Sequence, residues 1–148
     1  MDETYIKVNG QWKYLYRAVD KEGNTIDYLL TAKRDMKASK RFFSKAIKRN
    51  EHPELVNIDK SGANKAALNC INEEVENQIE IRQCKYLNNL IEQDHRNIKR
   101  ITRLILGFKN FHSAQKTIAG IELMKMIKKG QMKGDDLSPA EQFYSLAA

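Results

Sequence analysis

The first thirty residues, MDETYIKVNGQWKYLYRAVDKEGNTIDYLL (Met1–Leu30), specify the start of the architecture because strand-like runs alternate with turn signals. In the first run one strand face carries Thr4, Ile6 and Val8. Asn9-Gly10 is a strong hairpin signal, and a second turn cluster at 21–24 follows the run from 12 to 19. The stretch therefore predicts a meander of three antiparallel strands, with Asp2 on the first.

Beyond the meander, strand-like and helical patterns alternate. Apolar spacing predicts helices over 36–48 and 65–74, and short apolar or alternating runs predict strands over 55–58 and 78–87. Two further helices follow, one capped by Asn89 and ended by Gly107, the other capped by Ser113 and ended by Gly130. This order predicts an α/β protein with a mixed five-stranded sheet flanked by helices, as in a ribonuclease-H-like core. We expect one domain over 1–131 and a loose tail over 132–148.

Composition and charge exclude several classes. The chain has 148 residues, no apolar run long enough for a membrane span, and no basic-then-apolar start typical of a secretory signal. Its two cysteines and three histidines lack zinc-ligand spacing. Residues 82–133 carry 12 basic and 3 acidic side chains, a block that favours phosphate binding but is also compatible with solvated helix faces. We expect a cytoplasmic protein with no membrane partner.

Three carboxylates fall at the ends of predicted elements: Asp2, Asp59 and Glu92. Carboxylate oxygens suit Mg²⁺, and two such ions can support phosphodiester cleavage and transfer. On spacing alone the set is weak, because 19 acidic residues make such a pattern easy to find. Glu92 could instead complete a capping box with Asn89, and Glu3 should point to the strand face opposite Asp2.

The aromatic residues of the meander do not form an obvious base-stacking motif, which disfavours a general RNA- or DNA-binding module. We predict that they pack in the sheet: Tyr5, Trp12, Tyr14 and Tyr16.

Several blocks in order resemble one family. The strings MDETYIKVNGQWKYLYRAVD (1–20), NIDKSGAN (57–64), RQCKYLNNLIEQDHRNIKR (82–100), LGFKNF (106–111) and AGIELMKMIKKGQ (119–131) closely resemble the insertion sequence six family of DDE transposases. The resemblance implies a ribonuclease-H-like, retroviral-integrase-like fold and metal-dependent cutting and joining of element ends. It implies two Mg²⁺ or Mn²⁺ ions, DNA ends and target DNA as partners, a homo-oligomer in the active complex and association with the bacterial nucleoid.

Carried over by motif, the resemblance assigns the acidic triad, as catalytic and metal-binding residues, to Asp2, Asp59 and Glu92. Lys99, seven residues after the glutamate, corresponds to the family's basic residue near the reacting phosphate, and Arg96 and Arg100 are further candidates for phosphate contacts. Family members carry a helix-turn-helix before this domain, and the quoted blocks begin at Met1. The alternative function is a truncated, catalytically inactive form that at most binds DNA or full-length transposase.

Overall fold

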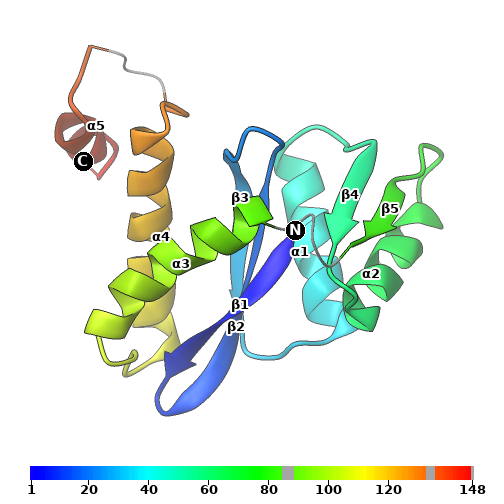
Figure 1. The fold of residues 1–148 in the computed structure, drawn as a ribbon, viewed down its shortest axis with the longest axis horizontal. Helices are drawn as coiled ribbons and strands as arrows, with labels where there is room; N and C mark the ends of the chain where they lie inside the picture. The colour runs from blue at the N-terminus through cyan, green and yellow to red at the C-terminus, as the bar shows by residue number, and fades with distance from the viewer. Residues whose placement is uncertain (85–88, 133–135, 148) are drawn as a thin grey trace.

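A three-stranded antiparallel meander forms the centre of the fold (Figure 1). The computed structural model describes residues 1–84, 89–132 and 136–147. The strands are β1 (Asp2–Val8), β2 (Gln11–Val19) and β3 (Thr25–Thr31). Asn9 and Gly10 form the tight turn between β1 and β2, with φ angles of 48° and 74°. Positive φ at both central residues is the geometry that Asn-Gly hairpins favour, so the predicted meander is confirmed.

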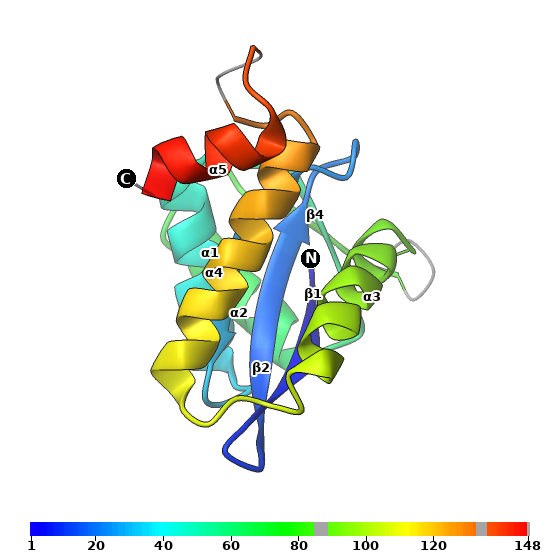
Figure 2. The same ribbon diagram turned by 90° about the vertical axis from the view of Figure 1, so that its left-hand side faces the viewer.

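Helices cover both faces of this sheet. Figure 2 shows α3 (Asn89–Leu104) and α4 (Phe111–Lys128) side by side on one face, with α1 (Met36–Arg49) and α2 (Gly62–Asn72) behind it. A fifth helix, α5 (Pro139–Ala147), contacts α4. Within the described residues, no helix has the length and apolar character that crossing a membrane requires.

The remaining strands, β4 (Leu55–Ile58) and β5 (Glu80–Gln83), form a separate parallel pair. The prediction of one five-stranded sheet is therefore wrong: among the described residues the pairing is three plus two. The physical reason lies at the start of β1, between the two sheets (Figure 1). There the amino group of Met1 donates a hydrogen bond to the Asn57 carbonyl oxygen at 2.8 Å. The single hydrogen bond between Met1 and Asn57 is too short a contact to form the ladder of backbone hydrogen bonds that would join β1 to β4 in one sheet.

Several element boundaries differ from those predicted. The helix expected over 65–74 is α2, which begins earlier and ends at Asn72. The strand expected over 78–87 appears as β5, and residues 85–88 lie outside the described part of the chain. Asn89 belongs to α3 itself. The cap of α4 is Asn110, whose Oδ1 accepts a hydrogen bond from the Ser113 N–H at 2.8 Å, so Ser113 is not the cap.

The two faces of the meander support two hydrophobic cores, because successive side chains on a strand point to opposite faces. The core facing α3 and α4 contains Ile6, Val8, Leu15, Leu30, Ile98, Phe108, Ala114 and Ile118. The core facing α1, α2 and the second sheet contains Met1, Tyr16, Phe42, Phe43, Ile58, Ala67, Leu68, Ile71 and Ile79. The start of β1, at Asp2, lies between these cores, and the candidate site forms there.

Candidate active site

Three carboxylates meet where β1 and β4 approach each other. Asp2, Glu3 and Asp59 each offer an oxygen, and these atoms all lie within 4.8 Å of one another. Asp2 begins β1, and Asp59 follows directly after β4. The structure thus brings together two of the three predicted acids. It adds Glu3, which was expected to point to the opposite strand face from Asp2. At the start of β1 both carboxylates nevertheless lie close to Asp59.

Asn64, on the first turns of α2, fixes two of these carboxylates. This fully buried amide donates to Glu3 Oε2 at 3.0 Å and to Asp59 Oδ1 at 3.2 Å. Its own oxygen accepts a hydrogen bond from Ser39 Oγ at 2.6 Å, which sets the orientation of the amide. The Ser61 N–H also donates to Asp59 Oδ1, at 3.0 Å. Asp59 therefore sits in a tight turn before α2, and two hydrogen bonds set the direction of its carboxylate.

Arg34 is the cation that faces this cluster. Its Nε donates to Glu3 Oε1, and its Nη2 lies 3.6 Å from Asp59 Oδ2. Its Nη1 donates to the Tyr5 hydroxyl at 3.4 Å. The Arg34 side chain is about one-third exposed, at 35%, so solvent also reaches it. The positive charge of the guanidinium therefore compensates mainly the negative charge of Glu3.

Arg34 forms ion pairs with Glu3 and Asp59, and no such contact with Asp2 is seen among the described residues. Burial of its side chain raises the pKa of Asp2 to about 6, and the charges of Glu3 and Asp59 add to the rise. The Glu3 N–H, which donates to Asp2 Oδ1 at 2.8 Å, opposes it. A partly buried carboxylate among like charges is the environment in which a divalent cation would favour the ionised form. The donor set, carboxylate oxygens only, fits a hard cation such as Mg²⁺ or Mn²⁺.

Helix α3 runs past Asp2 and brings His95 to it. His95 Nδ1 lies 3.9 Å from Asp2 Oδ2, and the imidazole is buried. Burial lowers the pKa of His95 to about 3, and the charges of Arg17 and Lys99 act in the same direction. The ring is therefore neutral at physiological pH.

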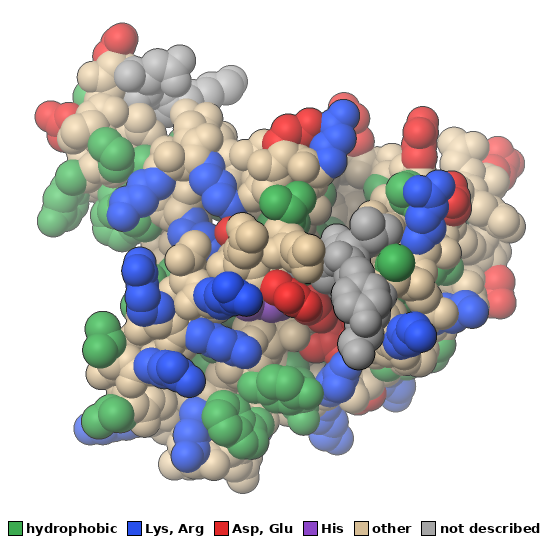
Figure 3. All heavy atoms as spheres, viewed as in Figure 1, with side chains coloured by type: hydrophobic (Ala, Val, Ile, Leu, Met, Phe, Trp, Pro, Cys, Tyr) green, Lys and Arg blue, Asp and Glu red, His purple; other side chains and the backbone are tan. Residues whose placement is uncertain are grey.

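The third predicted acid, Glu92, is exposed and is not among the clustered carboxylates. It lies three residues before His95, so the two side chains are neighbours on one helix face. Arg96, Lys99 and Arg100 are also exposed on α3. Figure 3 shows acidic side chains beside a histidine in the middle of this view, bordered by Lys and Arg side chains.

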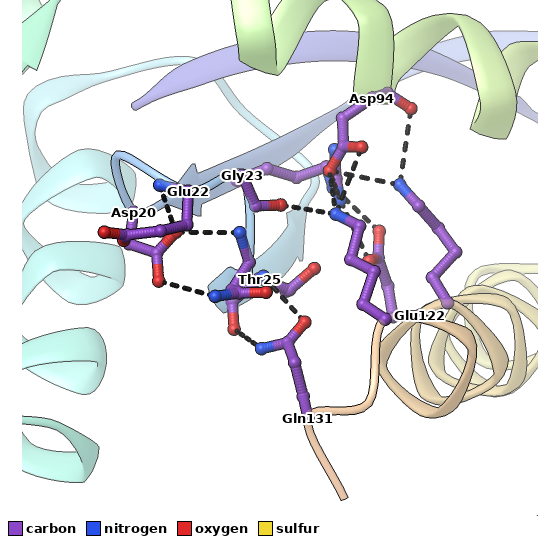
Figure 4. Close-up of polar contacts among 11 residues, drawn as sticks. Asp20, Glu22, Gly23, Thr25, Asp94, Glu122 and Gln131 are labelled. Carbon is purple, nitrogen blue, oxygen red and sulfur yellow. Dashed lines mark hydrogen bonds and ion pairs between the residues drawn. The ribbon is translucent and has the colours of Figure 1, made fainter.

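A buried ionic network holds α3 and α4 against the meander (Figure 4). Arg17 on β2 is fully buried; its Nε donates to Glu122 Oε1 at 2.7 Å, and its Nη2 donates to Glu122 Oε2 at 3.0 Å and to Asp94 Oδ2 at 3.1 Å. Lys125 and Lys129 also approach Asp94 Oδ2, at 3.3 and 3.2 Å. Burial acts to raise the pKa of Asp94, but the charges of Arg17 and Lys125 and the Lys129 hydrogen bond hold it below its usual value.

This network matters for the site because of the strand register. Asp2 is directly opposite Arg17 across the β1–β2 pair, so both side chains are on the sheet face that α3 covers. Asp94 immediately precedes His95 in α3. Anchoring Asp94 to Arg17 therefore fixes the helix that carries His95 beside Asp2. Sequence reasoning missed the network, because single charges at 17, 94 and 122 give no pairing signal.

Comparison with known proteins identifies the family of the chain. A family model described as a DDE domain matches residues 1–131. The chain belongs to the insertion sequence six family of DDE transposases. It is 40% identical to the transposase for insertion sequence-like element IS431mec of Staphylococcus aureus strain Mu50. The alignment spans 131 residues, which are 87% of this chain and 57% of the relative.

Two further relatives extend the comparison. The transposase for insertion sequence element IS257 in transposon Tn4003 of Staphylococcus aureus has the same identity and coverage. The uncharacterized protein pYV0051 of Yersinia pseudotuberculosis is 40% identical over 63 residues, covering 40% of this chain and 59% of the relative. No solved structure matches the chain significantly. The chain thus spans 57% of the length of the staphylococcal transposases, and the family match ends at residue 131, before α5.

Proposed function

We propose that this chain is a transposase catalytic domain that cuts insertion-sequence ends and joins them to target DNA by metal-dependent phosphodiester chemistry. The observation that carries the proposal is the convergence of Asp2 and Asp59, distant in sequence, with their oxygens within 4.8 Å at the junction of β1 and β4. Both are acids that the family resemblance assigns to the catalytic triad. An accidental surface cluster would have no reason to select these two positions.

The proposed metal ligands are Asp2, Asp59 and Glu92, holding Mg²⁺ or Mn²⁺, with two ions in the complete site. When bound, such ions activate the attacking oxygen and stabilise the leaving oxygen of the phosphodiester. Glu92 is a candidate because it lies one helical turn before His95, which is 3.9 Å from Asp2. Asn64 and Ser61 orient Asp59 for this task, and neutral His95 adds no positive charge that would compete with a cation beside Asp2.

The same geometry supports a role for the basic face of α3 in DNA binding. Lys99 and Arg96 follow Glu92 by seven and four residues, and exposed cations at this spacing can hold the phosphates that flank the reacting bond. Arg100 is a further candidate phosphate contact. Two element ends require two reacting sites, so we propose a homo-oligomer on DNA in the bacterial cytoplasm.

We also propose that the core is ribonuclease-H-like. The meander β3-β2-β1 and the parallel pair β4-β5 lie next to each other at the Met1–Asn57 hydrogen bond. Helices α3 and α4 on one face and α1 on the other agree with that layering. Residues 1–131 form the proposed catalytic domain, and 132–148 lie outside its family match.

Strand transfer on pre-nicked element-end DNA with Mn²⁺ tests this function. We expect joined products with the unaltered chain, and loss of them in Asp59→Asn and Glu92→Gln. Glu76→Gln is the matched control: Glu76 is exposed in the loop before β5 and is not one of the clustered carboxylates. Mn²⁺ binding measured by calorimetry should weaken in Asp59→Asn and be unchanged in the control.

Two results would contradict the enzymatic proposal. One is the absence of both joining and metal binding in the folded, unaltered chain. The other is joining that survives in both active-site variants. DNA binding retained without joining would instead identify the chain as a non-catalytic DNA-binding form.

A further inference from the structure

Two aromatic side chains predicted to pack in the sheet are exposed. Trp12 is 59% exposed and Tyr5 45% exposed, whereas Tyr16 is fully buried as predicted. The Tyr5 and Trp12 rings meet edge to face with centroids 6.4 Å apart, and Lys7 Nζ lies 5.8 Å from the centre of the Trp12 ring. An exposed aromatic pair held in fixed geometry beside a cation is characteristic of a recognition surface rather than of sheet packing.

These rings line a groove of about 660 Å³ between the β1–β2 hairpin and the C-terminal half of α3. Hydrophobic side chains lie among Lys and Arg side chains in the lower part of Figure 3, the region of this hairpin. Lys7, Lys99 and Arg103 contribute three positive charges to the walls, and none of the described lining residues is acidic. The groove therefore combines flat apolar surface with charge complementary to phosphate.

The groove begins next to the carboxylate cluster. Arg34, which pairs with Glu3, also donates a hydrogen bond to the Tyr5 hydroxyl. One side chain therefore contacts both the carboxylate cluster and a residue that lines the groove. Tyr5 follows Asp2 by three residues on β1, a distance of about 10 Å along an extended strand.

We propose that this groove binds an unpaired stretch of the DNA substrate, with a base stacked on Trp12 and neighbouring phosphates on Lys99 and Arg103. The inference rests on the proposed function, since it names the form of DNA that the site holds. Exposed aromatic rings interleaved with cations are the means by which proteins bind single strands. Paired bases are already stacked on their neighbours, so a duplex offers phosphates to the cations but no free base face to Trp12.

The test uses intrinsic fluorescence, because Trp12 is the only tryptophan in the chain. The probes are a short oligothymidine, an abasic strand of equal length and a blunt duplex, titrated at low salt with a metal chelator. We expect oligothymidine to quench Trp12 fluorescence and the abasic strand to quench it much less. The chelator removes metal-dependent chemistry, so failure here and failure of strand transfer are separate outcomes.

Variants complete the test. Affinity for oligothymidine, measured by anisotropy of a labelled strand, should fall roughly 5- to 150-fold in Trp12→Ala and recover in Trp12→Phe. Duplex affinity should change little in Trp12→Ala but fall in Lys99→Ala. Tyr144→Ala is the control, since Tyr144 is an exposed aromatic on α5, away from the groove.

Three results would overturn the proposal: equal quenching by abasic and oligothymidine strands, equal loss in Trp12→Ala and Tyr144→Ala, or no binding of any probe. Self-association that quenches Trp12 without DNA would instead identify the groove as a contact between copies.

Discussion

Replacing Glu122 with leucine should destabilise the chain strongly, because Arg17 and Glu122 are both fully buried and bonded through two short contacts. The change leaves a buried guanidinium with Asp94 as its remaining acidic contact among the described residues, while Arg17 Nη1 has no hydrogen-bond partner there even in the intact network. Breaking a buried pair on one side costs about 3–5 kcal/mol. That is a large part of the roughly 5–15 kcal/mol that stabilises a typical domain.

The assay is urea unfolding followed by circular dichroism, with thermal melting alongside. A loss of about 3–5 kcal/mol corresponds to a fall in Tm of roughly 6–20 °C for a chain of this size. Glu74→Leu is the matched control: Lys40 Nζ lies 2.6 Å from Glu74 Oε1, but the Glu74 side chain is 60% exposed. An exposed pair of the same length contributes only about 0–1 kcal/mol.

A second comparison separates the charge from the space it occupies. The double variant Arg17→Met/Glu122→Leu removes both buried charges and should recover much of the stability lost in Glu122→Leu. The reasoning is refuted if Glu122→Leu costs no more than Glu74→Leu, or if the double variant is the less stable of the two. Loosening Arg17 should also reduce strand transfer, since it frees the helix segment that carries Asp94.

Two further outcomes follow from the site. The folded pKa of Asp2, about 6, lies above its ordinary value of 3.8, so the contribution of Asp2 to stability should fall as pH rises from about 4 to 6. Buried His95, whose pKa is lowered to about 3, contributes in the opposite direction over the same range. Asp2→Asn removes only the first contribution, so stability should rise more steeply with pH in the variant than in the unaltered chain, measured by metal-free urea unfolding at successive pH values; a wild-type profile in the variant would contradict the assignment. Asn64→Ala should cost about 1–3 kcal/mol and weaken Mn²⁺ binding, because it leaves Glu3 and Asp59 without a buried donor. Asn69→Ala, at an exposed position of the same helix, should change neither the free energy of unfolding nor Mn²⁺ affinity. If the two variants have equal effects in urea unfolding and calorimetry, the proposed role of Asn64 is refuted.

Local patterns were sufficient for the elements. The Asn9-Gly10 turn, the alternation of Thr4, Ile6 and Val8, and the helical spacing in α1, α3 and α4 are each properties of short segments. Boundaries were less well predicted where competing polar residues were close together. Asn110 caps α4 although Ser113 offered a similar hydroxyl, because both residue types satisfy the free N–H groups of a helix start.

The candidate site was also predicted only in part. Motifs that resemble the family pointed to Asp2, Asp59 and Glu92, but the sequence could not show that the Glu3 carboxylate lies beside those of Asp2 and Asp59. Alternation along a strand predicted that Glu3 points away from Asp2. This fails at the start of β1, where Asn64 and Arg34 hold the Glu3 carboxylate beside Asp59. Exposure of Trp12 was also beyond the pattern, because period-two alternation does not say where a hairpin extends past its neighbours.

The family, the α/β element order and a proposal for the catalytic acids followed from the sequence, because turn chemistry, periodicity and residue type are local properties. Which charges pair with one another became clear only from the folded chain. Arg17 with Asp94 and Glu122, Asn64 with Glu3 and Asp59, and Tyr5 with Trp12 depend on strand register and helix docking. The physical reason is that long-range contacts are set by the joint packing of elements whose separate patterns carry no information about their partners.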